Sequence, residues 1–295
     1  MKTKGEFDFT AGTSGMQPQC IRVTANAKIN LALSVVGRRA DGYHEIDTVM
    51  QSVSLGDIVK LKKSRTVSVG CSTAGLEGGK NIAFYAAELF FEKSGINAGA
   101  DIYIEKHIPQ AAGLGGGSAD AAAVLCGLNR LYDAGLSYAA LCSAAGALGA
   151  DVPFFISGGT QRAEGTGEKL TKLPAFGGGV FLLAKQGEKR STGEMYAQLD
   201  LKKYPRPDIN ALVSALGKGP FDGLFKNSFS VCWNGEFEKR LEKTGALAVS
   251  LSGSGPFRFA LFPDIPSAAA AKAGLAAEGI ESIIAEPCDF ALKFE

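Results

Sequence analysis

One glycine-rich segment constrains the fold of this chain more than any other part of its sequence. Residues 109–123 have the sequence PQAAGLGGGSADAAA. Residues 101–105, just before it, alternate apolar and polar side chains, which predicts a half-buried strand. After it, apolar residues recur at spacings of three and four, as on one face of a helix: Ala121, Leu125, Leu128 and Tyr132. The segment therefore connects a strand to a helix that begins near Ser118.

A glycine-rich connection into a helix start is typical of a phosphate site. Glycines allow consecutive backbone N–H groups to converge on one point, because no Cβ stands in the way. The first turn of a helix adds unpaired amides and the positive end of the helix dipole, and both favour an anion. A small-residue linker is the plain alternative, and the regular structure expected on both sides disfavours it.

Three familiar phosphate loops do not fit this segment. A Walker loop requires Gly-Lys-Ser/Thr, whereas Gly117 and Ser118 are followed by Ala119. A dinucleotide fingerprint would need glycine where Ser118 stands. A protein-kinase glycine loop lies between two strands, not before a helix. The segment is thus a phosphate loop without a lysine of its own, so the charge needed for chemistry has to come from elsewhere.

The charge balance excludes several classes of partner. Lysine and arginine number 31 against 30 acidic residues, so there is no overall field to recruit nucleic acid or an anionic membrane. No apolar run is long enough to span a bilayer. We therefore expect neither a nucleic-acid nor a membrane partner, and no obligatory protein partner is evident.

The cysteines and the N-terminus indicate an intracellular protein. Six cysteines are widely spaced, with no C-x-x-C pair and only two histidines, which disfavours a zinc site and leaves any metal ligands unknown. Structural thiols in a reducing compartment are expected, which predicts a cytoplasmic location. Residues 1–20 lack the apolar core of a secretion signal and are interpreted as a tail.

The rest of the chain mixes strands with helices in two parts. Two strand-like runs are expected within 21–36, on either side of residues 27–30, and further strands from 46 to 69, at 180–184 and at 257–262. Helices are expected over 81–93, closed by Gly95, and from a cap at Ser137 to Gly149. In the second half, helices should cover one face of the strands. We place the domains at 21–165 and 166–295.

Two charged residues are candidates for chemistry. Pro153 biases Val152 towards an extended conformation, so Asp151 is expected on a turn after a helix. It is either a surface turn residue or a base that accepts a hydroxyl proton. Lys28 lies in an apolar strand and is either a snorkelling edge lysine or paired. If it meets Asp151, it favours the charged carboxylate, and Asn30 faces the same side.

Two further segments have weaker patterns. Tyr43 and His44 follow the turn signal Asp41-Gly42, so a ring and an imidazole could meet a nucleobase; a core-packed tyrosine and a solvated histidine are the alternative. Residues 250–256, SLSGSGP, are either a simple turn or a backbone ridge against phosphates.

Together these segments resemble the GHMP kinase superfamily, whose members carry an N-terminal substrate motif, a central phosphate loop and a C-terminal glycine-rich motif. Within it, the chain is similar to the 4-diphosphocytidyl-2-C-methyl-D-erythritol kinases at 27–31 (AKINL), 37–44 (GRRADGYH), the central loop and 149–155 (GADVPFF). The similarity extends over about residues 21–295.

The resemblance implies a fold, a reaction and two substrates. The fold is a two-domain α+β GHMP kinase fold, with an N-terminal domain like ribosomal protein S5 domain 2 and a ferredoxin-like C-terminal domain. The reaction is ATP-dependent phosphorylation of the 2-hydroxyl of a cytidine diphosphate-linked methylerythritol, a step of non-mevalonate isoprenoid synthesis, with Mg²⁺ accompanying the ATP. Homoserine or mevalonate as the acceptor, and a nucleotide-binding regulator without turnover, stay open as alternatives.

The resemblance also implies roles for individual residues. Lys28 and Asp151 match the catalytic pair. The substrate contacts are expected to be Asn30, Tyr43, His44, Thr192 and Tyr196. The ATP phosphates are expected at Pro109, Gln110, Ala111, Ala112, Gly113, Leu114, Gly115, Gly116, Gly117, Ser118 and Ala119. Ala119 stands where many relatives have serine, and residues 227–229 and 256–258 depart from the family pattern, so no site residue is assigned there.

Overall fold

The structure is a computed structural model that describes residues 19–188, 191–200, 206–217 and 219–295. The tail was predicted over residues 1–20. Residues 1–18 lie outside the described residues, and β1 begins at Cys20. Within the described ranges, no helix combines the length and apolar character needed to cross a bilayer.

A mixed, mostly antiparallel sheet is the larger of two sheets. Its central path has the order β12-β1-β2-β4-β3, while β11 and β5 pair with β2, and β6 pairs with β5. Among the described strands of this sheet, only β3 and β4 pair in parallel. Its strands are β1 (Cys20–Arg38), β2 (His44–Ser64), β3 (Ser68–Cys71), β4 (Gly99–Glu105), β5 (Thr160–Gly165), β6 (Lys169–Lys172), β11 (Pro287–Cys288) and β12 (Leu292–Phe294).

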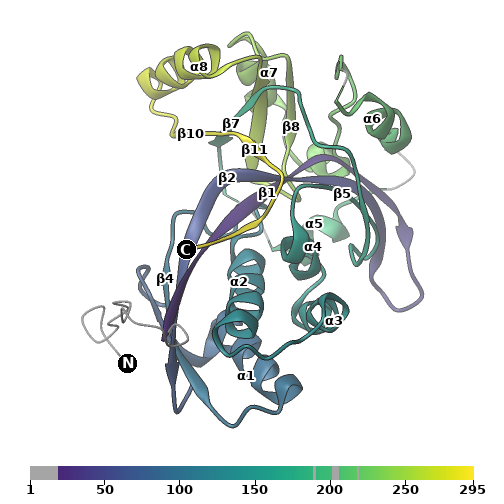
Figure 1. Ribbon diagram of the computed structural model, residues 1–295. Helices are drawn as coiled ribbons and strands as arrows, with labels where there is room; N and C mark the ends of the chain where they lie inside the picture. Colours follow the sequence, from purple (N-terminus) through teal and green to yellow (C-terminus); the bar gives the residue numbers. More distant parts are fainter. Residues whose placement is uncertain (1–18, 189–190, 201–205, 218) are drawn as a thin grey trace.

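Four helices cover one side of this sheet (Figure 1). They are α1 (Ile82–Ser94), α2 (Gly116–Leu131), α3 (Tyr138–Leu148) and α4 (Val152–Ser157), and a short 3-10 turn, η2 (Gly78–Lys80), precedes α1. The predicted cap at Ser137 forms, because its side chain accepts from the N–H of Ala140. Asn81, the first residue of the predicted helix 81–93, is the cap of α1 and accepts from the N–H of Ala83. Both helices end at the expected glycines, Gly95 and Gly149. Apolar side chains between the four helices and the sheet form one core.

A second, four-stranded antiparallel sheet has the order β10-β7-β9-β8. Helices α7 and α8 pack on one of its faces, as expected, and form a second core with it. Along the chain, these elements follow the order strand, helix, strand, strand, helix, strand. With the strand order of this sheet, they form a ferredoxin-like arrangement. The elements are β7 (Val180–Lys185), α5 (Thr192–Ala197), α6 (Ile209–Ala215), η3 (Ser228–Cys232), α7 (Glu236–Glu242), β8 (Ala248–Leu251), β9 (Phe257–Phe262), α8 (Ile265–Ala277) and β10 (Ser282–Ala285).

The two sheets meet across the middle of β1 and β2. Ile29, Leu31 and Val49 pack with Phe181 and Phe259 in an apolar cluster between them. Because side chains alternate along a strand, Lys28 and Asn30 lie on the opposite face of β1. Because the middle of β1 lies where the two sheets meet, these polar residues lie at the junction of the two halves.

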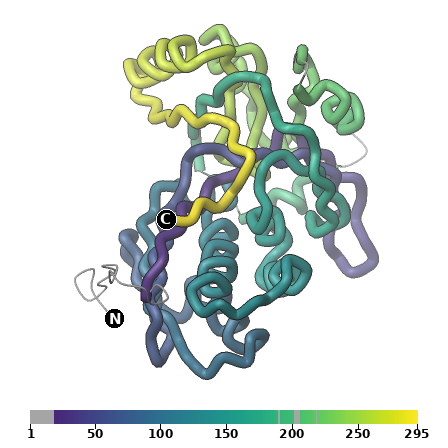
Figure 2. The backbone as a smooth tube through the Cα atoms, in the orientation of Figure 1, coloured from purple at the N-terminus to yellow at the C-terminus, as the bar shows by residue number. Residues whose placement is uncertain are grey.

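The C-terminal residues return to the first sheet. In Figure 2 the yellow C-terminal segment runs back along the purple start of β1, and β12 pairs with β1 from Val23 to Ala25. The predicted boundary near residue 165 coincides with the end of β5, while β6, β11 and β12 lie in the first sheet although they follow it in sequence.

Two local predictions are wrong. Val152 is the first residue of α4, not an extended residue, because a proline is tolerated in the first helical turn, where no N–H needs an internal partner. Residues 21–36 form part of one continuous strand, not two runs, since register shifts at Asn26/Ala27 and Asn30/Ala32 absorb the irregularity.

Candidate active site

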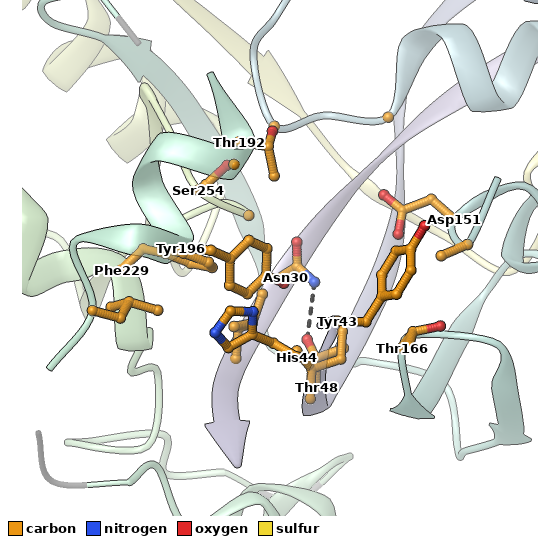
Figure 3. A pocket seen from close by; sticks show the side chains of 18 of the residues that line it. Asn30, Tyr43, His44, Thr48, Asp151, Thr166, Thr192, Tyr196, Phe229 and Ser254 are labelled. Carbon is orange, nitrogen blue, oxygen red and sulfur yellow. Dashed lines mark hydrogen bonds between the residues drawn. The ribbon is translucent and has the colours of Figure 1, made fainter. Parts of the chain in front are cut away.

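A cavity of about 770 Å³ opens at the junction between the two halves (Figure 3). Its walls come from β1, β2, the start of α4, α5 and the glycine-rich segment before β9. All seven residues predicted for catalysis or substrate binding line it: Lys28, Asn30, Tyr43, His44, Asp151, Thr192 and Tyr196.

Lys28 and Asp151 meet at one end of this cavity. The Nζ of Lys28 is 3.4 Å from Oδ2 of Asp151 and donates a hydrogen bond of 2.7 Å to Oδ1 of Asn30. The side chain of Lys28 is 5% exposed, whereas that of Asp151 is 40% exposed. The ammonium is therefore enclosed by its partners, while the carboxylate remains reachable from the cavity.

The start of α4 positions Asp151. The chain leaves α3 at Gly149 and enters α4 at Val152, with Asp151 as the residue before the helix. Its side chain does not cap the helix. A carboxylate commonly accepts from first-turn N–H groups at this position, so the absence of that bond leaves its oxygens directed to the cavity.

Aromatic side chains form another part of the cavity wall. The rings of His44 and Tyr196 are stacked, with centroids 4.5 Å apart and an interplanar angle of 19°. Phe229 packs edge-on against Tyr196 at 4.8 Å. Tyr43 is 68% exposed, so its ring is available to a ligand. The alternative of a core-packed tyrosine at this position is therefore wrong.

The local environment sets the protonation of these rings. Burial, together with the charge of Arg38, lowers the pKa of His44, so its imidazole is neutral at pH 7 and offers one donor and one acceptor. Burial, with the nearby charge of Asp151, raises the pKa of Tyr196 to about 12. Tyr196 therefore stays a neutral phenol.

Helix α5 presents Thr192 and Tyr196 to the same cavity. Ser191 and Glu194 form a reciprocal capping box that fixes the start of the helix. Thr192 and Tyr196 are four residues apart, so both lie on one face of the helix. The capping box thereby orients the hydroxyl and the ring together.

A second cavity, of about 450 Å³, lies over the phosphate loop. Nine of the eleven predicted loop residues line it, and the other two, Leu114 and Ala119, are fully buried in the apolar cores. Helix α2 begins at Gly116, close to the expected start, after Gly115 in a left-handed conformation. Since Ala119 is buried, it contributes packing and not a side-chain contact to the cavity.

Gly113 and Gly115 line both cavities, so the two cavities meet at the loop. The backbone N–H of Lys28 donates to the carbonyl of Leu114 at 3.0 Å, which ties the loop to β1. A Cβ on Gly115 would lie 2.6 Å from the ring of Phe155 and 3.1 Å from Cγ of Lys28. Glycine at this position therefore allows the lysine and the loop to approach each other.

The glycine-rich segment before β9 also belongs to the site. Gly253 and Ser254 line the larger cavity, and the hydroxyl of Ser252 donates to the carbonyl of Gly113 at 3.1 Å. Asn227 donates from Nδ2 to the carbonyls of Leu251 and Gly253, both at 2.8 Å. The sequence predicted this segment only as a simple turn or a backbone ridge against phosphates. No neighbouring residues indicated that Asn227 would hold the segment through its side-chain amide.

A buried charge cluster beside the loop was also not predicted. Lys106 lines the smaller cavity and pairs with Asp120 at 2.7 Å and with Asp57. Burial alone would lower the pKa of Lys106, but the charges of Asp120 and Asp57 outweigh it and raise that pKa. The sequence offered one signal for this cluster: Lys106 stands directly after the predicted strand 101–105 and before the loop. Its partners could not be inferred, because they lie at other places in the sequence.

The described residues contain no group of three or more histidine, cysteine, aspartate or glutamate side chains placed to hold a metal ion. None of the six cysteines forms a disulfide. The site therefore consists of a lysine, a carboxylate, amides and aromatic rings beside a glycine loop.

Two family models match the chain. The model of the GHMP kinases N terminal domain matches residues 81–159, and that of the GHMP kinases C terminal domain matches residues 235–281. The first match contains the phosphate loop and Asp151, and the second contains the glycine-rich segment before β9.

Proteins named 4-diphosphocytidyl-2-C-methyl-D-erythritol kinase are similar over most of their length. That of Acetivibrio thermocellus is 41% identical over 87% of this chain and 95% of its own, and that of Caldicellulosiruptor bescii is 40% identical over 82% and 89%. A crystal structure of 4-(cytidine 5'-diphospho)-2C-methyl-D-erythritol kinase, 33% identical, superimposes with a TM-score of 0.76 over 90% of this chain and 99% of its own.

A homoserine kinase from Cytophaga hutchinsonii shares the fold alone, with 21% identity and a TM-score of 0.72 over 97% of this chain and all of its own. The matches at higher identity cover nearly all of their relatives' length, and both halves of the chain match the same superfamily. This chain therefore belongs to the GHMP kinases and, within them, to the family of 4-diphosphocytidyl-2-C-methyl-D-erythritol kinases.

Proposed function

We propose that this protein transfers the γ-phosphoryl group of ATP to the 2-hydroxyl of 4-diphosphocytidyl-2-C-methyl-D-erythritol, giving the 2-phosphate and ADP. The observation that carries this proposal is the meeting of two cavities at Gly113 and Gly115, beside the Lys28–Asp151 pair. One cavity has a phosphate-binding loop and the other an aromatic wall, as a reaction between a nucleotide and a base-bearing acceptor requires.

Asp151 is proposed as the general base. Its carboxylate takes the proton of the substrate hydroxyl while that oxygen attacks the γ-phosphorus, and the bond from the γ-phosphorus to the bridging oxygen of ADP breaks. ADP leaves with the electron pair of that bond. Because the side chain of Asp151 is 40% exposed, the proton it has gained can pass to water.

Lys28 is proposed to stabilise the negative charge that develops during transfer. One of its three N–H groups is held by Asn30, and the ammonium lies 3.4 Å from Asp151, which leaves N–H groups for the reacting oxygens. A pre-oriented cation in an enclosed site stabilises such charge far more than a solvated one does. This supports the catalytic role for Lys28 that the family resemblance implies.

The aromatic wall supports a cytosine-bearing acceptor. A neutral His44 can donate to and accept from the edge of the base, while the rings of Tyr43 and Tyr196 offer faces for stacking. Homoserine and mevalonate carry no base, so a kinase for either would have no use for these rings.

The glycine loop is proposed to hold the ATP phosphates through backbone N–H groups and the start of α2. Mg²⁺ enters with ATP as part of the substrate. Ser118 supplies a hydroxyl beside the cavity, and Mg²⁺ bound mainly by phosphates needs few protein ligands, so the residues fit it. A cytoplasmic location stays a prediction from the cysteine pattern.

A panel of acceptors tests the function. Purified protein with ATP and Mg²⁺ is given the cytidyl substrate, homoserine or mevalonate, and ADP release is measured for each. We expect acceptor-dependent ADP release with the cytidyl substrate only. Release with another acceptor would assign a different GHMP kinase activity, and ATP binding with no acceptor-dependent release would assign a regulator without turnover.

A further inference from the structure

Thr48 is a cavity-lining residue that the proposed mechanism does not use. It lies on β2 and is 1% exposed. Its Oγ1 is 2.6 Å from the carbonyl oxygen of Ala32 and 2.9 Å from Nδ2 of Asn30. Figure 3 shows the contact with Asn30 as a dashed line within the cavity.

The chemistry of these groups fixes the direction of each hydrogen bond. A carbonyl oxygen only accepts, so the hydroxyl of Thr48 donates to Ala32, and its lone pairs accept from the amide nitrogen of Asn30. The amide oxygen of Asn30 must then point the other way, where it accepts from Nζ of Lys28 at 2.7 Å. The orientation of the Asn30 amide thus follows from its partners.

The strand pairing places these residues on one face. Asn30 lies opposite Met50, and Thr48 is two residues from Met50 on the same strand. Residues two apart on a strand face the same side, so Thr48 is the diagonal neighbour of Asn30. The register shift between Asn30 and Ala32 falls at this contact. The hydrogen-bond series is therefore built into the pairing of β1 with β2.

We propose that Thr48 is a positioning residue for phosphoryl transfer, which sets, through the amide of Asn30, the direction in which Lys28 presents its ammonium. The inference rests on the proposed function. With one N–H of Lys28 held by Asn30 and the ammonium 3.4 Å from Asp151, the bond to Asn30 sets how the other N–H groups face the carboxylate and the cavity. If the Asn30 amide turned over, its NH₂ group would face the ammonium and repel it.

The test replaces Thr48 by valine, which removes the hydroxyl at nearly constant shape. We expect kcat to fall about 10²-fold, because small displacements of a catalytic group have effects of this size. KM for ATP should stay within about twofold, since the phosphate loop is not touched. Thr48→Ser keeps the hydroxyl and should retain most of the activity.

Thr160→Val is the matched control. Thr160 is a buried strand threonine, 2% exposed, whose hydroxyl donates to Oε1 of Gln51 at 2.6 Å, and it lines neither cavity. Urea unfolding should show similar losses of stability in the two valine variants. Only the variant at position 48 should lose kcat.

A double-mutant cycle separates action through Asn30 from a direct effect. In an Asn30→Ala background, Thr48→Val should lower kcat no further. The inference is overturned if Thr48→Val lowers kcat no more than Thr160→Val does, or if Thr48→Ser lowers kcat as much as Thr48→Val. It is also overturned if Thr48→Val lowers kcat by the same factor in the Asn30→Ala background as in the wild type. A wild-type protein inactive on every acceptor would instead overturn the proposed function and this inference with it.

Discussion

At the scale of single residues, Lys28 and Asp151 differ in a way that suits their proposed roles. The ammonium is enclosed by Asn30 and the loop, while the carboxylate faces open space. A base must reach a substrate hydroxyl and release its proton afterwards, whereas a stabilising cation acts best when water is excluded.

Replacing the proposed base should impair chemistry and not nucleotide binding. For Asp151→Asn we expect kcat to fall about 10²- to 10⁴-fold, the range typical of a lost general base, with KM for ATP nearly unchanged. Steady-state kinetics at saturating acceptor measures both constants. Asp264→Asn, a helix cap distant from the cavities, is the control, because asparagine caps equally well. Unchanged turnover in Asp151→Asn would contradict the role.

The buried cluster of Lys106, Asp57 and Asp120 predicts a pH-dependent stability. Two carboxyl groups share one ammonium, so full ionisation would leave an excess buried negative charge. Asp57 accepts from the backbone N–H groups of His107 and Ile108, whereas Oδ1 of Asp120 is buried without a hydrogen-bond partner. Burial, only partly offset by Lys106, raises the pKa of Asp120 to about 8.

The sign of the effect follows from proton binding. Between the ordinary aspartate pKa of 3.8 and the folded value of about 8, the folded protein holds a proton that the unfolded chain has lost. The contribution of Asp120 to the free energy of unfolding therefore falls as pH rises through this window. Urea unfolding at several pH values should show a weaker decline for Asp120→Asn than for the wild type. Parallel pH dependences of the two proteins would contradict this assignment.

Sequence reasoning predicted the residues whose chemistry conflicts with their local pattern, and not those defined by distant partners. Lys28 stood out because an ammonium in an apolar strand needs a partner. Thr48, in contrast, is an ordinary strand residue until the register with Asn30 is known. Asp57 and Asp120 likewise could not be predicted as a charge cluster until the fold showed that both pair with Lys106.

At the scale of elements, the loop and the start of α2 behave as one unit. Gly115 precedes the helix with φ of 75°, a conformation that disfavours residues with a Cβ, and its neighbours leave no room for a side chain. Gly117 lies within the first turn and has only one atom, Cγ2 of Ile82 at 3.7 Å, near the position of a Cβ.

The two glycines therefore predict opposite outcomes. Gly115→Ala should destabilise the protein by about 1–3 kcal/mol and strongly reduce activity, because Phe155 or Lys28 must move. Gly117→Ala should leave the stability unchanged or raise it slightly, since alanine favours a helix. Thermal unfolding and kcat/KM for ATP measure both effects. Equal behaviour of the two variants would contradict the close packing at Gly115.

Elements with clear end signals were predicted well. Helix α3 begins at the expected cap, α1 begins within one residue of its predicted start, and both end at the expected glycines, because side-chain caps and glycine stops act locally. The start of α4 was missed because the bias of Pro153 on Val152 was outweighed by the compatibility of proline with a first helical turn.

At the scale of the whole molecule, the C-terminal residues complete the first sheet. Strand β12 pairs with β1, and the backbone N–H of Asn26 donates to the carbonyl of Ala291 at 2.8 Å. A Cβ on Gly158, directly after α4, would lie 2.0 Å from the N of Ala291. The end of the chain thus packs against the segment that follows the helix of Asp151.

Removing residues 292–295 should destabilise the whole protein. The truncation leaves β1 without its outer partner, and a few backbone hydrogen bonds at about 1 kcal/mol each predict a loss of about 2–4 kcal/mol. Calorimetry measures the shift in Tm. Glu295→Ala is the control, because it removes exposed ion pairs with Arg22 and Lys293 and should change stability by less than about 1 kcal/mol. A truncated protein as stable as the full chain would contradict a structural role for β12.

The return of β11 and β12 to the first sheet had no signal in the sequence. Each strand is too short to show a period, and their pairing partners, β2 and β1, lie near the other end of the chain. The family resemblance implied the two-domain fold, whereas local patterns alone gave no strand order. Long-range pairing depends on contacts that no window of neighbouring residues contains.

The same closure has a consequence for how the protein is made. Synthesis on the ribosome runs from the N-terminus, so β1 emerges before the other described strands and its outer partner, β12, emerges after them. The phosphate loop, Lys28 and Asp151 are all available long before the sheet beneath them is complete. The first sheet therefore cannot close beneath the site until β12 has been synthesised, so assembly of the supported site is a late event relative to synthesis of its own residues.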